Sequence, residues 1–84
     1  MTILTENDWN AVSNALRNLQ YIELDRTFQP TGTRVVVTVE PAKKPWTVAA
    51  VVKVVGYFRG GLWHQYFESV EEAKRAVLKW NGWL

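Results

Sequence analysis

Residues 56–74 read GYFRGGLWHQYFESVEEAK, and this stretch decides the fold. Two aromatic runs flank Gly60 and Gly61, and consecutive glycines accept the positive φ values of a tight hairpin turn. The pattern therefore predicts a β-hairpin with its turn at the glycine pair. Ser69 and Glu72 follow at the spacing of a capping box, which predicts that a helix begins directly after the last strand.

Two amphipathic helices are expected, one near each end of the chain. Thr5 is a good N-cap for the first helix, and Asp8 complements the positive charge of the helix start. Apolar residues then recur at helical spacing, at Trp9, Val12, Leu16 and Leu19. The second helix is expected to bury Val70, Ala73, Val77 and Trp80 and to end near Gly82.

Between the helices, alternating and β-branched segments predict strands. The expected strands are 21–28, 34–40, 46–58 and 62–68. The third is long for one strand, and Gly56 is the expected place of a bulge or bend. The predicted fold is α+β: a helix, an antiparallel meander of three to four strands and a second helix, with both helices packed on one sheet face.

The composition describes one folded domain over residues 1–84, since 48% of the chain is apolar and five residues are Trp. The chain has no cysteine, which excludes a disulfide framework and cysteine-based metal sites and permits a reducing compartment. No secretory signal and no apolar run long enough for a membrane span is visible. We therefore expect a cytoplasmic protein that does not interact with membranes.

The segment 48–55 is apolar on both of its alternating faces, apart from Lys53. Two helices cover only one face of a four-stranded sheet, so the other face is expected to meet a second protein surface. The expected interface residues are Val36, Ala49, Val51, Val55, Tyr57 and Trp63. Two alternatives stay open: other parts of the chain, at 1–30 or 83–84, cover this face, or the sheet curls into a partial barrel.

Candidate catalytic residues are few. His64 is the only histidine, and no motif places a nucleophile or an orienting carboxylate beside it. Glu23 and Asp25 share a strand face, but this alternation is typical of the solvent side of a strand. One histidine without cysteine does not make the usual zinc site. We therefore expect no enzyme activity, no cofactor and no metal.

Nucleic-acid binding is the alternative function. Residues 41–84 carry seven basic and three acidic side chains, whereas residues 1–40 carry three basic and five acidic ones. Basic side chains that neutralise phosphate, beside aromatic rings that stack on bases, are typical of sheet-based readers. The candidate residues are Lys43, Lys44, Trp46, Lys53, Arg59 and Tyr66.

The helix-sheet-helix order resembles the double-stranded-RNA-binding domain, and EAKRA at 72–76 is similar to that family's second helix. The resemblance implies a duplex ligand. However, that family places consecutive lysines at the start of this helix, whereas this chain has Glu71 and Glu72, which repel phosphate. The chain is therefore not assigned to that family.

The leading hypothesis is a non-enzymatic protein-interaction module that forms a homodimer or docks on a larger protein through the apolar sheet face. Small, Trp-rich, cysteine-free proteins are often phage or mobile-element inhibitors of host machinery, and this association makes an inhibitor one form of the hypothesis. The partners expected are a protein, a second copy of the chain or, in the alternative, nucleic acid. Neither a membrane nor a small-molecule cofactor is expected.

Overall fold

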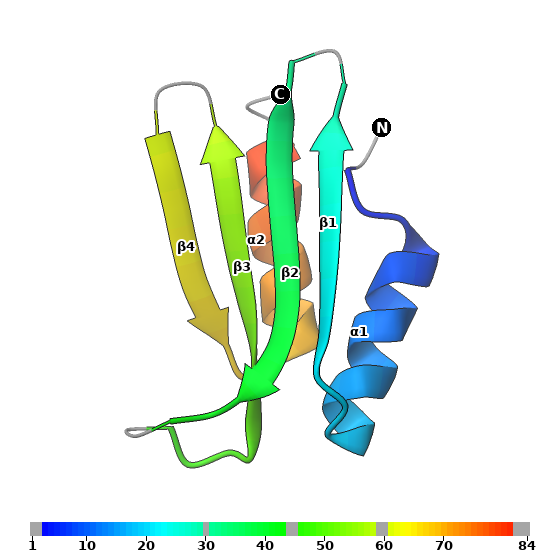
Figure 1. The fold of residues 1–84 in the computed structure, drawn as a ribbon, viewed down its shortest axis with the longest axis vertical. Coiled ribbons are helices and arrows are strands. Elements are labelled where there is room, and N and C mark those ends of the chain that lie inside the picture. Colours follow the sequence, from blue (N-terminus) through cyan, green and yellow to red (C-terminus); the bar gives the residue numbers. More distant parts are fainter. Residues whose placement is uncertain (1–2, 30, 44–45, 59–60, 82–84) are drawn as a thin grey trace.

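The computed structural model describes residues 3–29, 31–43, 46–58 and 61–81. Its elements are, in chain order, α1 (Glu6–Asn18), β1 (Ile22–Phe28), β2 (Thr33–Pro41), β3 (Ala50–Phe58), β4 (Gly61–Phe67) and α2 (Val70–Asn81). The strands form one antiparallel sheet in the order β1-β2-β3-β4 (Figure 1). The predicted order of helix, antiparallel meander and helix is confirmed.

The strand register divides the sheet into a helix-covered face and an open face. One row across the helix-covered face consists of Leu24, Val37, Val54 and Gln65. The next row, on the open face, consists of Asp25, Val36, Val55 and His64. Because strand side chains alternate with a period of two, this register fixes the face of every residue in the four strands.

The core is a layer of valines between the sheet and the two helices. The sheet contributes Val35, Val37, Val39, Val52 and Val54, all of them fully buried. The helices contribute Trp9, Val12, Ala15, Ala73 and Val77 to the same cluster. β-branched side chains fit the pleated surface, and each one buried contributes on the order of 1.5 kcal/mol.

Thr5 caps α1 as predicted. The Asp8 N–H donates to Thr5 Oγ1 at 3.1 Å, and the Thr5 N–H donates back to Asp8 Oδ2 at 3.0 Å, which completes a capping box. The prediction that Leu19 continues the buried stripe is wrong. Leu19 ends the helix at φ 54° and is 51% exposed. Its left-handed backbone turns the side chain out of the helical repeat, and Ala15 is buried instead.

Ser69 caps α2 through a hydrogen bond from the Glu72 N–H to Ser69 Oγ at 3.2 Å. Among the described residues only this half of the predicted capping box is formed. Lys74 Nζ donates to Glu6 Oε1 at 2.9 Å and so joins the two helices. This hydrogen bond, the main cause, raises the pKa of Lys74. The predicted burial of Trp80 and the predicted end at Gly82 lie outside the described side chains and residues.

The third strand differs from its prediction in two ways. It begins at Ala50, not at residue 46, because the Trp46 N–H donates to the Lys43 carbonyl and closes a turn in the β2–β3 connection. Gly56 forms no bulge, since its pairings with Val35 and Trp63 continue both registers without a break. At the predicted hairpin turn, residues 59–60 lie outside the described residues.

Candidate functional site

The open face combines a charged half and an aromatic half. On the β1 and β2 side, this face carries Glu23, Asp25, Thr27, Arg34, Val36, Thr38 and Glu40. On the β3 and β4 side are Val51, Lys53, Val55, Tyr57, Leu62, His64 and Tyr66. The first group contains four charged side chains and the second only Lys53, so polarity changes from one edge of the sheet to the other.

In the charged half, Asp25 and Arg34 form an ion pair across β1 and β2. Arg34 Nε donates to Asp25 Oδ1 at 2.8 Å, and Arg34 Nη2 donates to Asp25 Oδ2. The hydrogen bond from Arg34 lowers the pKa of Asp25, and the same bond raises the pKa of Arg34. The guanidinium also lies 5.1 Å from the ring centre of Tyr57. Arg34 is therefore engaged within the chain by both a carboxylate and a ring.

Tyr66 has a comparable cation beside it. Lys53 Nζ lies 5.6 Å from the centre of the Tyr66 ring, a cation–π distance. Lys53 and Tyr66 are direct cross-strand neighbours, as their register requires. Each of the two open-face tyrosines thus has one side of its ring next to a cation of the same chain.

An apolar patch, consisting of Val36, Val55, Tyr57 and Leu62, lies between β2 and β4. Val36 is the neighbour of Val55, and Tyr57 is the neighbour of Leu62. Val36 is buried at the base of the patch, whereas Tyr57 is 43% and Leu62 62% exposed. Two large apolar side chains therefore stand side by side in solvent on a face that neither helix covers.

Val51 is not available on this surface, although sequence analysis placed it in the interface. It lies on the open face but is only 1% exposed. Val51 lines a hollow of about 220 Å³ together with Glu40, Pro41, Lys43, Trp46 and Tyr66. The β2–β3 connection, which carries Trp46, thus covers this end of the sheet. This connection is not one of the covering segments, 1–30 and 83–84, that were considered from the sequence, and residues 83–84 lie outside the described residues.

The other predicted interface residues lie in three different parts of the structure. Val36, Val55 and Tyr57 lie together in the apolar patch. Ala49 is exposed in the connection that precedes β3. Trp63 pairs with Gly56 on the helix-covered face and packs against the core, so it does not belong to the open face. Its predicted place there was wrong because Gly56 introduces no bulge.

Four of the six residues predicted to bind nucleic acid lie close together. Lys43, Trp46 and Tyr66 line the hollow over Val51, and Lys53 is beside the Tyr66 ring. Glu40 lines the same hollow and adds a negative charge to it. Lys44 and Arg59, also predicted, lie outside the described residues.

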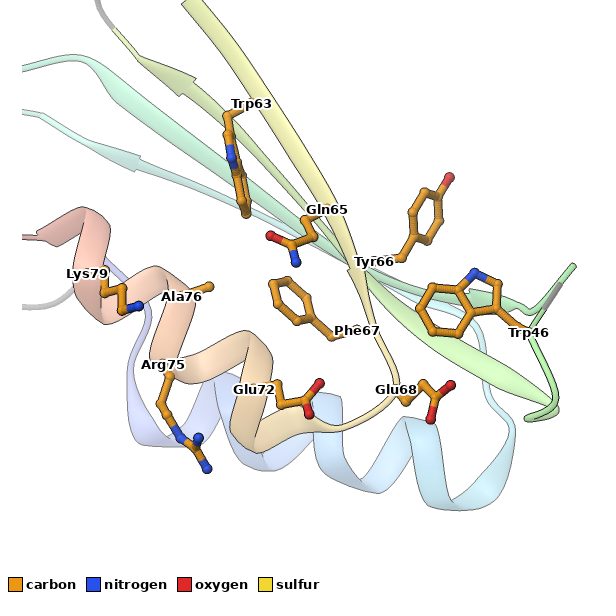
Figure 2. Close-up of a pocket in the computed structure, with 10 residues that line it drawn as sticks. All are labelled: Trp46, Trp63, Gln65, Tyr66, Phe67, Glu68, Glu72, Arg75, Ala76 and Lys79. Atoms are coloured by element: carbon orange, nitrogen blue, oxygen red, sulfur yellow. The ribbon is translucent and has the colours of Figure 1, made fainter. Parts of the chain in front are cut away.

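A groove of about 740 Å³ separates β4 from α2 (Figure 2). It is lined by Trp46, Trp63, Gln65, Tyr66, Phe67, Glu68, Glu72, Arg75, Ala76 and Lys79. The contribution of α2 to this groove was not predicted from the sequence. Its residues 72, 75, 76 and 79 share one helical face by their spacing, but only the tertiary structure places that face beside β4.

The described residues contain no group of three or more His, Asp or Glu side chains that could hold a metal ion. His64 is exposed on the open face opposite Val55. No helix in the described part of the chain has the length and apolar character to cross a membrane. No family model, curated protein or solved structure matches this chain. The function is therefore inferred from the geometry of the sheet and helices alone.

Proposed function

We propose that this chain is a non-enzymatic protein-interaction module that docks on a partner protein through the apolar patch of the open face. The observation that carries the proposal is the exposure of Tyr57 and Leu62 as direct neighbours on a sheet face without a covering helix. Exposed apolar side chains that adjoin one another, rather than scatter singly, are typical of protein contact surfaces.

The surroundings of the patch support a protein contact. Burying a large apolar side chain gains about 1.5–3 kcal/mol, and aromatic residues near the centre of an interface often act as its anchors. Arg34, Asp25 and Lys53 surround the patch with charges that already have partners within the chain. Such a surface has an apolar centre and a polar rim, the common anatomy of protein interfaces.

A matched pair of tyrosine variants tests the proposal. Tyr57→Ser removes an anchor from the patch, whereas Tyr21→Ser removes an equally prominent tyrosine, 58% exposed, that precedes β1 outside the patch. Immobilised wild type and both variants are incubated with a cell extract treated with nuclease. A captured protein is then purified and its affinity for each form is measured by calorimetry.

We expect a partner protein that binds wild type and Tyr21→Ser with the same affinity. It should bind Tyr57→Ser about 30-fold more weakly, because the variant lacks a central anchor of the interface. Circular dichroism checks that Tyr57→Ser is folded. Equal affinity of the purified partner for a folded Tyr57→Ser and for wild type would contradict docking through the patch.

Nucleic-acid binding is a second candidate, supported by the convergence of Lys43, Trp46, Lys53 and Tyr66 at one end of the open face. Its test is a Trp-fluorescence titration with single-stranded and duplex oligonucleotides at low and high salt. Binding that weakens steeply with salt and is reduced by Lys43→Ala with Lys53→Ala supports it. Absence of a fluorescence change at low salt removes it.

A further inference from the structure

The two edges of the sheet differ in chemistry. β1, the first edge, carries Glu23, Asp25 and Arg26, and Arg26 points onto the helix-covered face. Charged and inward-pointing charged residues on an edge strand discourage other strands from pairing with it. β4, the second edge, reads GLWHQYF and has no Asp, Glu, Lys or Arg over its length. Of the two edges, only β1 has these protective charges.

The backbone of β4 presents hydrogen-bonding groups outward. The Ala42 N–H donates to the Ala49 carbonyl at 3.1 Å, which marks a hydrogen-bonded pair at the end of the β2–β3 ladder. Such pairs alternate along antiparallel strands, so Val52, Val54 and Gly56 direct their backbone groups to β4. Their β4 partners are Phe67, Gln65 and Trp63. The intervening residues Leu62, His64 and Tyr66 therefore direct their N–H and C=O groups to the outer edge of β4, which pairs with no other described strand and is called the free edge below.

The groove beside this edge has opposite charges at its two ends. Figure 2 shows Lys79 at the end near Trp63, and Glu68 at the other end, where β4 passes into α2. Glu72 in the first turn of α2 adds to the acidic end. A surface with this arrangement is complementary to a copy of itself rotated by a two-fold axis, because each acidic end then meets a basic end.

We propose that a second copy of this chain pairs with the free edge of β4, in antiparallel orientation, to form a homodimer with one continuous sheet. α2 contacts β3 and β4, so a two-fold axis beyond β4 would place the two α2 helices about two strand spacings apart. That spacing is about 10 Å, the distance at which helices pack. The helices would run antiparallel, with Glu72 of each facing the Lys79 end of the other.

This interface shares only Leu62 with the apolar patch and goes beyond the proposed function. It uses the backbone edge of β4 and the groove beside α2, whereas the patch lies on the open face. Pairing would also set the two open faces side by side on one surface. The dimer can therefore exist without the docking function, and the docking function without the dimer.

The first test separates backbone from side chain at one position. His64→Pro removes the outward N–H without removing a hydrogen bond to β3, and proline is tolerated on the free side of an edge strand. His64→Ala removes the same side chain but keeps the N–H. Light scattering across protein concentration is expected to give a dimer for wild type and His64→Ala, and a monomer for His64→Pro.

The second test uses exposed charges on α2, so it does not depend on the folding of a proline variant. Glu72→Lys and Lys79→Glu are each expected to raise the dimer dissociation constant about tenfold, because two attractive pairs become repulsive. The double variant Glu72→Lys/Lys79→Glu restores opposite charges across the interface and is expected to recover most of the affinity.

Three results would overturn the dimer: a wild type that stays monomeric at every concentration, a folded His64→Pro that dimerises like wild type, or charge reversals whose effects simply add. Tyr57→Ser is the control for the proposed function and should remain dimeric. If Tyr57→Ser loses the dimer while His64→Pro keeps it, self-association uses the apolar patch and not the β4 edge.

Discussion

Arg26 of β1 donates two hydrogen bonds to Asp8 of α1, from Nη2 to Oδ1 at 3.0 Å and from Nε to Oδ2 at 3.3 Å. Asp8 also accepts the N–H of Thr5 in the capping box of the same helix. One carboxylate thus starts α1 and attaches it to an edge strand. The same pair places a charge on the inner side of β1, which distinguishes that edge from β4.

Asp8→Asn should lower the free energy of unfolding by about 1–2 kcal/mol, because it removes a charge-assisted bond to a partly exposed arginine and weakens a helix cap. Urea denaturation near neutral pH measures the loss. Asp25→Asn is the control. Both side chains of the Asp25–Arg34 ion pair are exposed, so its loss should change the free energy of unfolding little. Equal losses in the two variants would contradict the special position of Asp8.

The same pair predicts a pH dependence. Burial raises the pKa of Asp8, but hydrogen bonds from Arg26 and Thr5 and the charge of Arg26 outweigh it, so the pKa lies below its usual value. A lowered folded-state pKa stabilises the fold fully above the unfolded-state value of about 4, and this stability is lost as the pH falls through the folded-state value. Wild type should therefore lose more stability than Asp8→Asn between neutral pH and strongly acidic pH. If urea denaturation shows that wild type and Asp8→Asn lose the same free energy of unfolding over this pH range, the prediction is wrong.

Leu19→Gly should raise the free energy of unfolding by up to about 1 kcal/mol. Leu19 has φ 54°, where a side chain is unfavourable and glycine is not. Its side chain is largely in solvent, so little packing is lost with it. Leu19→Ala keeps the β-carbon and should give no such gain. If alanine stabilises as much as glycine, backbone conformation is not the cause.

Val51 and Val55 offer a comparison on one strand and one face. Val51→Ala should cost about 2 kcal/mol, because its side chain is fully covered, and Val55→Ala clearly less, because it is half-buried. Thermal unfolding of both variants measures the difference. Equal costs would mean that the β2–β3 connection does not cover Val51 in solution.

Local signals in the sequence predicted the order of elements and both helix starts. Thr5 and Ser69 each accept a hydrogen bond from the backbone N–H three residues later, so their capping roles follow from sequence spacing alone. The face of Trp63 could not be predicted in this way. It depends on whether Gly56 adds a residue to β3, and that is decided by pairing with two other strands.

The site was less predictable than the fold for the same reason. The apolar pattern of 48–55 predicted an uncovered face, but no local pattern indicates that the connection carrying Trp46 lies over Val51. Nor does a helical repeat indicate which strand it will face. The groove between β4 and α2 therefore appears only when both elements are placed.

The difference between the two sheet edges is tested most directly by amide hydrogen exchange, read residue by residue by NMR at low and high protein concentration. The backbone N–H groups of Trp63 and Gln65 bond to β3 and should be protected at both concentrations. Those of Leu62, His64 and Tyr66 point to the free edge and should become protected only at high concentration, as a second copy pairs with β4. Rapid exchange of these three amides at every concentration would contradict the account.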